Sequence, residues 1–190
     1  MPTESSINRR PIALMLALGA AFLSMVRIAP HDFPFPNLSL MGAIALFCGA
    51  RLRGAWVYAI PFGLMILSDS ILYLRFDYVP FDPFVYAIYL LYIVAGRAWL
   101  RNSESPWKMG GSVIVLSSVF FLVTNFGSWV MKAMPYPNTF GGLMESYVAG
   151  VSFHRPFLLG DILGVMLLFG THALLTRCVP STERVGEVVS

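Results

Sequence analysis

The chain has 190 residues, of which 57% are hydrophobic and only 12% are charged. Because soluble domains carry about 25% charged residues, this composition excludes an ordinary water-soluble fold and favours an integral membrane protein. The formal net charge of +3 comes from Lys and Arg residues scattered at the ends of apolar runs, so we interpret them as topology signals and expect no nucleic-acid partner.

Apolar runs separated by Pro, Gly and charged residues predict an all-α, polytopic membrane bundle of about six helices, forming one domain over residues 1–190. The expected spans are 11–28, 38–50, 55–74, 81–100, 110–131 and 157–177. A helix needs about 20 apolar residues to cross the bilayer, so the second run is short for a span. We expect it to be tilted, re-entrant or extended by the residues before it.

The stretch between the fifth and sixth expected spans has an amphipathic pattern. From Pro135 to Arg155, the residues Leu143, Tyr147 and Val151 recur at four-residue spacing. This spacing predicts a short helix at the membrane interface, separate from the span that follows and capping one end of the bundle.

Lys and Arg residues are distributed unequally between the two sides of the predicted membrane. With the N-terminus inside, nine of the 13 lie on the inner side, and the other four are Arg27, Arg75, Lys132 and Arg155. Because cytoplasmic loops carry the excess of Lys and Arg, both termini are expected in the cytoplasm. The predicted localisation is the bacterial inner membrane, as a multi-pass protein surrounded by the lipid bilayer.

Two carboxylates, a carboxamide and a hydroxyl lie inside the predicted spans at a similar depth. Asp69 is near the outer end of the third span, Thr124 and Asn125 are near that of the fifth, and Asp161 follows the outer start of the sixth. At 1.5 Å per residue, all lie roughly 6 to 9 Å below the outer boundary. Ionisable residues at membrane depth mark functional sites by default. We therefore expect an outward-facing pocket that binds a small solute, with aromatic walls formed by Tyr86, Tyr89, Phe121, Phe126 and Trp129.

Other interpretations of these polar residues remain open. They are also the residues that would hold helices together through hydrogen bonds, with no ligand at all. An intramembrane enzyme would use Asp69 and Asp161 as an acid and base pair on a lipid-linked substrate. The chain has no HExxH or GxSxG motif, so no catalytic residue is assigned and an enzyme is not expected. Cys48 and Cys178 form no CxxC pair, and neither a metal site nor a cofactor is expected.

The first expected span carries small residues in register. Ala13, Ala17 and Ala21 recur at four-residue spacing, which lets another helix backbone approach closely. This face is predicted to dock a partner protein. Packing inside the chain itself is the alternative.

The segment from Asn37 to Ala50, together with Ser68-Asp69, Thr124-Asn125-Phe126 and Gly160-Asp161, resembles an uncharacterised family of small bacterial membrane proteins. The resemblance covers about residues 30 to 176. More distantly, the size and six-span layout resemble the substrate-binding subunits of energy-coupling factor transporters, which capture vitamins at their outer side. In those subunits an alanine-spaced first helix meets the membrane coupling subunit, so the resemblance implies a coupling subunit and ATPases as partners.

The expected function is therefore membrane transport. The chain would be a substrate-capture subunit or a small solitary transporter for a micronutrient such as a vitamin, and the candidate binding residues are Asn37, Asp69, Thr124, Asn125 and Asp161. A cobalamin-type ligand is one possibility, because His31 or His154 would offer an imidazole to cobalt. An assembly scaffold, which needs only packing surfaces, is the alternative from another class.

Overall fold

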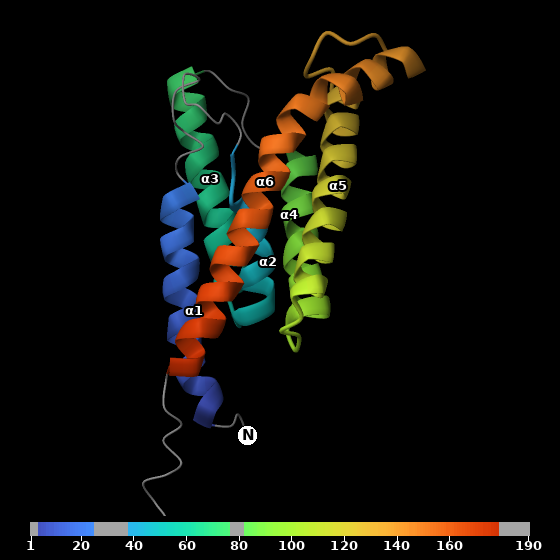
Figure 1. Cartoon of the computed structure of the whole chain (residues 1–190). Helices are drawn as coiled ribbons and strands as arrows, with labels where there is room; N and C mark the ends of the chain where they lie inside the picture. The colour runs from blue at the N-terminus through green and yellow to red at the C-terminus, as the bar shows by residue number, and fades with distance from the viewer. Residues whose placement is uncertain (1–3, 25–37, 77–81, 179–190) are drawn as a thin grey trace, which may run out of the picture.

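The computed structural model describes residues 4–24, 38–76 and 82–178, and within these ranges the regular structure is helical. Its α-helices are α1 Glu4–Leu23, α2 Met41–Arg51, α3 Trp56–Phe76, α4 Pro83–Ala95, α5 Pro106–Val130 and α6 Phe140–Cys178. A π-helical turn, Gly96–Leu100, continues α4. The start of α1, the end of α6 and the α2–α3 and α4–α5 connections all lie at one end of the bundle, the lower end in Figure 1.

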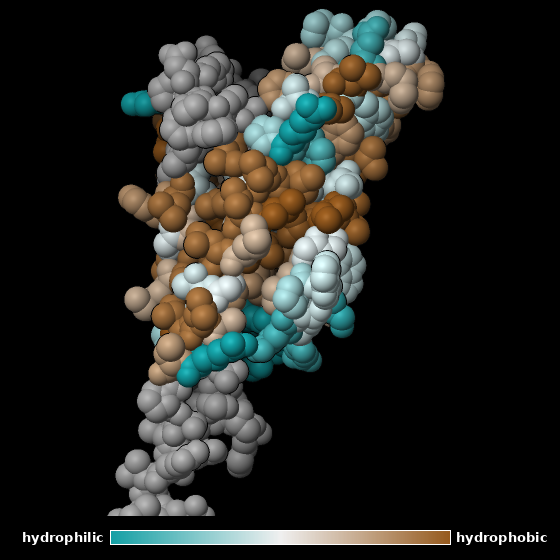
Figure 2. Space-filling model, viewed as in Figure 1, coloured by the Kyte–Doolittle hydropathy of each residue, from teal (hydrophilic) through white to brown (hydrophobic). Residues whose placement is uncertain are grey.

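Four helices are long and apolar enough to cross a membrane, which is consistent with the expected helical membrane bundle. They cover Trp56–Arg75, Pro83–Leu100, Pro106–Val130 and Phe140–Cys178. Two shorter apolar helices, Arg10–Leu23 and Met41–Arg51, accompany them. The first expected span, 11–28, is described only as far as residue 24. The surface shows a broad apolar zone between more polar ends (Figure 2), as expected for a protein surrounded by acyl chains.

Local capping explains where α4 and α5 begin. Asp82 accepts a hydrogen bond from the backbone N–H of Phe84 (2.8 Å), and Pro83 occupies the first helical position. Ser105 caps α5 in the same manner and is also followed by proline. Both pairs combine a side-chain acceptor with a residue that has no N–H to satisfy. These two starts are therefore determined by the local sequence.

The predicted interfacial helix and the predicted sixth span are parts of one helix, so the expected separation between them is wrong. Helix α6 continues through Pro156. Proline removes one helical hydrogen bond, but apolar helices tolerate it where neighbouring helices support the backbone. Here α5 gives that support, because Ser146 Oγ donates to the carbonyl of Asn125 (3.0 Å) and the Tyr147 hydroxyl donates to that of Leu122 (3.2 Å). The upper part of α6 leans over α5 (Figure 1).

Helix α2 lies in the middle of the bundle and corresponds to the second expected span, which was expected to be tilted, re-entrant or extended. Every residue from Met41 to Ala50 is buried. Its 11 residues extend about 16 Å, roughly half of the ~30 Å hydrocarbon core, so it does not span a bilayer alone. A helix that is apolar on all sides is one surrounded by protein. Residues 38–40, which precede it, are not helical. We therefore describe α2 as a buried half-helix.

The alanine face of α1 points into the bundle. Ala13 and Ala17 are 1% and 0% exposed, and Ala21 is half-buried. Helix α1 packs through this side against α2, α3 and α6. In this conformation the small residues therefore pack within the chain. Ala13 and Ala17 offer no accessible surface for the partner docking that was predicted for them.

Candidate functional site

Asp161 is buried near the middle of α6. Its side chain is 0% exposed, and its carboxylate accepts hydrogen bonds from the Tyr92 hydroxyl (2.9 Å) and the backbone N–H of Ala43 (3.1 Å). The backbone N–H of Gly42 also donates to it. A buried carboxylate is strongly unfavourable unless its oxygens are hydrogen-bonded. The hydrogen bonds from these three donors offset the free-energy cost of burying the Asp161 carboxylate.

The Asp161 carboxylate acts as the N-terminal cap of α2. The first N–H groups of a helix have no acceptor within it, and the N-cap side chain usually supplies one. In α2 the N-cap residue is Leu40, whose side chain accepts no hydrogen bond. Ser39 Oγ accepts from the N–H of Met41 (3.2 Å), and Asp161 accepts from the two residues that follow. Its carboxylate also lies at the positive end of the helix dipole.

Glycines allow α2 and α6 to approach this closely. A Cβ on Gly42 would overlap the Asp161 carboxylate and the ring of Tyr92. A Cβ on Gly160 would overlap the backbone carbonyl of Ser39. Small residues at helix contacts bring backbones together, as expected within apolar bundles.

Glycines also allow α2 and α4 to approach each other closely. A Cβ on Gly49 would overlap the carbonyl of Ile93, and one on Gly96 would overlap the carbonyl of Leu46. Gly96 also begins the π-helical turn. Such turns are rare, and those that occur are often found at functional sites. The half-helix is thus enclosed by close backbone contacts on two sides.

Asp69 lies on α3 and is 6% exposed. Its carboxylate accepts a hydrogen bond from the hydroxyl of Tyr86 on α4 (3.1 Å). The Tyr86 ring stacks on Phe62, with centroids 6.0 Å apart and an interplanar angle of 8°. The neighbouring Ser68 is satisfied locally, because its hydroxyl donates to the carbonyl of Met65. The hydrogen bond and the ring stack both link α3 to α4.

One face of α4 connects the two carboxylates. Tyr86, Tyr89 and Tyr92 recur at three-residue spacing, and the first and last donate to Asp69 and Asp161. Tyr89 contacts the Tyr92 ring at a centroid distance of 5.8 Å. The Tyr89 ring also contacts Phe120 of α5 (5.7 Å), and Phe120 stacks on Phe157 of α6 (4.3 Å). The tyrosine row, Tyr86, Tyr89 and Tyr92, therefore joins four helices.

The other predicted site residues have different partners. Thr124 donates to the carbonyl of Phe120 (2.8 Å), and the Asn125 side chain donates to that of Phe121 (2.8 Å), both within α5. Asn125 also packs closely against Gly150 of α6. The structure thus connects Asp69 and Asp161 through α4, whereas Thr124 and Asn125 belong to the α5–α6 contact.

The remaining candidates contribute less to this site. Asn37 and His31 lie outside the described residues. His154 packs its ring against Phe121, with centroids 4.9 Å apart. Among the predicted wall residues, Phe126 and Trp129 form a separate pair. No three His, Cys, Asp or Glu side chains in the described part of the chain come together as metal ligands would.

Sequence reasoning missed the three residues that donate to Asp161. Tyr92 donates through its hydroxyl and Gly42 and Ala43 through their backbone N–H groups, yet none of them was a candidate. Two signals were present in the sequence: tyrosines at three-residue spacing, and a short apolar helix whose N-cap residue, Leu40, has no polar side chain.

Four long apolar helices around a buried half-helix are consistent with a helical membrane protein. The chain belongs to DUF6580, a family of unknown function that matches residues 5–182. Comparisons with curated proteins and with solved structures found no match for it.

Proposed function

We propose that this chain is a membrane transport protein that captures a small solute, as a substrate-capture subunit or as a small solitary transporter. The observation that carries the proposal is the half-helix α2, which begins inside the bundle with the carboxylate of Asp161 at its N-terminus. Helices that start or stop within the membrane are costly. They recur in transporters, where their ends build solute and ion sites near the midplane.

The solute-contacting region is proposed to lie around Asp69 and Tyr86. A carboxylate accepts hydrogen bonds from a solute, and the stacked rings of Tyr86 and Phe62 supply a flat apolar surface beside it. This chemistry suits a small, flat molecule with N–H or O–H donors, such as a vitamin-like micronutrient. Asp161 is assigned the structural part, because its hydrogen bonds hold α2 in place.

Substitutions at Asp69 and Tyr86 test the capture function. In Asp69→Asn and Tyr86→Phe, loss of a charge-assisted hydrogen bond should lower the amount of co-purified small molecule by about tenfold. The measurement is native mass spectrometry of gently purified protein, with the melting temperature recorded on the same preparations. Tyr73→Phe, at an exposed tyrosine of α3, is the matched control.

Three results decide against capture. One is a wild-type protein that carries no small molecule. The second is a co-purified molecule that the Asp69 and Tyr86 variants retain as fully as the control does. The third is a retained protein partner in place of a small molecule, which favours the scaffold alternative.

We also propose that both termini are cytoplasmic. The basic segments Arg51–Arg53 and Arg97–Lys108 lie at the same end of the bundle as the start of α1 and the end of α6 (Figure 1), in keeping with the positive-inside rule. Reporter fusions after Arg53 and after Lys108 should behave as cytoplasmic, and a fusion after Asp82 should behave as external. The reverse pattern would overturn this orientation.

In its more specific form, the proposal is that this chain works with a coupling subunit and ATPases, as in energy-coupling factor transporters. Because Ala13 and Ala17 are buried in this conformation, such a subunit would contact other parts of α1. The exposed side of that helix carries Met15, Leu18 and Phe22.

A further inference from the structure

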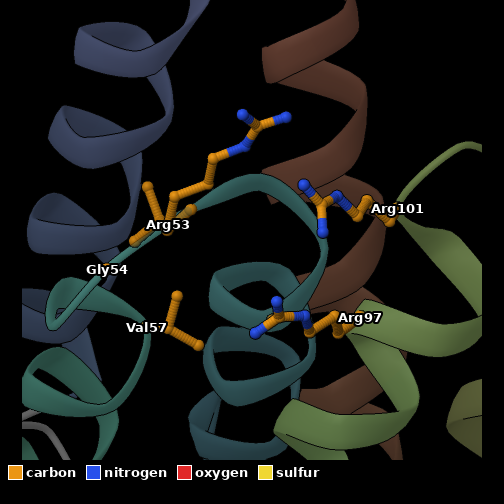
Figure 3. A pocket seen from close by; sticks show the side chains of 7 residues that line it. Arg53, Gly54, Val57, Arg97 and Arg101 are labelled. Atoms are coloured by element: carbon orange, nitrogen blue, oxygen red, sulfur yellow. The ribbon is translucent and has the colours of Figure 1, made fainter.

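A small pocket at the lower end of the bundle is lined by three arginines. Arg53 follows α2, Arg97 is the second residue of the π-helical turn, and Arg101 directly follows that turn. Figure 3 shows Arg97 and Arg101 extending toward the connection that carries Arg53. The cavity has a volume of about 130 Å³, and Gly49, Leu52, Gly54 and Val57 form the rest of its lining.

The pocket is held in shape by a fourth arginine. Arg51, the last residue of α2, donates to the carbonyls of Leu100 and Arg101 (both 3.0 Å) and of Ser103 (3.0 Å). Its guanidinium also lies over the ring of Phe169, 5.3 Å from the centroid. These bonds fasten the α4–α5 connection to the end of α2. The walls that carry the three lining arginines are therefore fixed relative to each other.

The backbone on the α2 side is shaped for this geometry. Gly54 has a φ of 68°, a left-handed conformation that other residues rarely adopt, and it turns the chain directly after Arg53. Leu52 and Val57 on either side are buried and form an apolar floor. The arginine side chains of the pocket thus lie beside a buried apolar floor.

The pocket concentrates positive charge without a matching carboxylate. None of the seven residues that line it is Asp or Glu. Glu104, in the neighbouring connection, interacts electrostatically with Arg51. Like charges repel one another, although Arg53, Arg97 and Arg101 are exposed, so water and salt weaken the repulsion between them. An anion in the cavity would remove this repulsion.

We infer that this arginine pocket binds a phosphate group, carried by an anionic phospholipid headgroup or by free phosphate. Arginine is the residue best suited to phosphate, because its planar fork donates two parallel hydrogen bonds. The cavity is well below the roughly 300–1,000 Å³ of pockets that enclose a whole small molecule, so it fits a headgroup-sized anion and not the captured solute.

Nearby tryptophans place the pocket at headgroup depth. Trp56 begins α3, Trp99 lies in the π-helical turn and Trp107 is the second residue of α5, and all three are exposed at this end. Exposed tryptophans gather at the boundary between acyl chains and headgroups. Basic pockets between helices at this level bind anionic headgroups.

The test uses Arg97→Gln, Arg101→Gln and their double variant in the full-length protein. The matched control is Arg75→Gln, which removes an exposed arginine at the opposite end, on α3. In the first arm, protein from nanodiscs of equal phosphatidylglycerol and phosphatidylcholine is analysed by native mass spectrometry. Wild type should retain phosphatidylglycerol preferentially, and each single variant should weaken this preference by about tenfold.

The second arm distinguishes the two sources of phosphate. Inorganic phosphate is compared with chloride at equal ionic strength, by melting temperature in detergent. A phosphate-specific rise that the double variant abolishes identifies free phosphate as a ligand, whereas retention of phosphatidylglycerol without that rise identifies the lipid headgroup. Arg97→Lys should recover only part of the binding, because it keeps the charge but loses the fork.

Two results would overturn the inference. The first is wild-type protein that shows neither lipid preference nor a phosphate-specific rise. The second is a set of Arg97 and Arg101 variants that match Arg75→Gln in both arms. Arg53→Gln provides an independent variant if either of the others melts at a lower temperature in chloride.

Discussion

Replacing Asp161 with leucine is expected to destabilise the folded protein by about 3 to 5 kcal/mol, because it leaves buried donors without an acceptor. The backbone N–H groups of Gly42 and Ala43 and the hydroxyl of Tyr92 all donate to this carboxylate. None of them has access to water at the centre of the bundle. Half-helix α2 would lose its cap and the favourable charge at its N-terminus together.

The measurement is equilibrium unfolding by SDS in mixed micelles, followed by tryptophan fluorescence. Tyr92→Phe is the graded comparison and should cost about 1 to 2 kcal/mol, since it removes one hydrogen bond and leaves both backbone donors paired with Asp161. Asp161→Asn should fall between the two, because one oxygen remains as an acceptor. If Asp161→Leu unfolds at the wild-type midpoint, the capping role assigned to this carboxylate is incorrect.

Gly160→Ala is expected to destabilise the protein by about 1 to 3 kcal/mol or more, as an overpacked helix contact does. The added methyl would overlap the backbone carbonyl of Ser39, which cannot rotate away as the end of a long side chain would. Helix α6 would have to shift from the segment that precedes α2. That shift would also draw Asp161 away from the N–H groups that it caps.

Gly170→Ala, on the same helix, is the matched control with the opposite expected sign. Nothing lies within 4 Å of a Cβ at Gly170, so alanine there should stabilise α6 by about 0.5 to 1 kcal/mol through helix propensity. Both variants are compared in the same unfolding assay. Equal effects at the two positions would show that the close α6–Ser39 approach does not exist in the membrane.

The Asp161 cap and the proposed arginine pocket lie at opposite ends of the same half-helix. At its start, α2 is held by Asp161, and at its end Arg51 fastens it to the α4–α5 connection. Glycines on two sides keep its backbone against α4 and α6.

Composition and hydrophobic runs were sufficient to predict the membrane-type helical bundle. The third expected span, 55–74, corresponds to Trp56–Phe76, and the fourth corresponds to α4 with its π-helical turn. These helices could be predicted because the apolar length of a helix and its caps depend on one stretch of sequence. Asp82 and Ser105, for example, cap the helices that directly follow them. The short length of the second run also predicted that α2 would not span normally.

Only the tertiary structure decided what the buried polar residues contact. Asp161 and Ala43 are 118 positions apart, and no local pattern specifies which face of one helix meets the end of another. An interfacial helix within residues 135–155 and a span over 157–177 were expected to be separate, but packing on α5 supports one continuous α6 through Pro156. Small residues at regular spacing predict a close helix contact without specifying the partner, so the sequence left both another protein and the chain's own helices open for Ala17; in the structure Ala17 packs inside its own bundle.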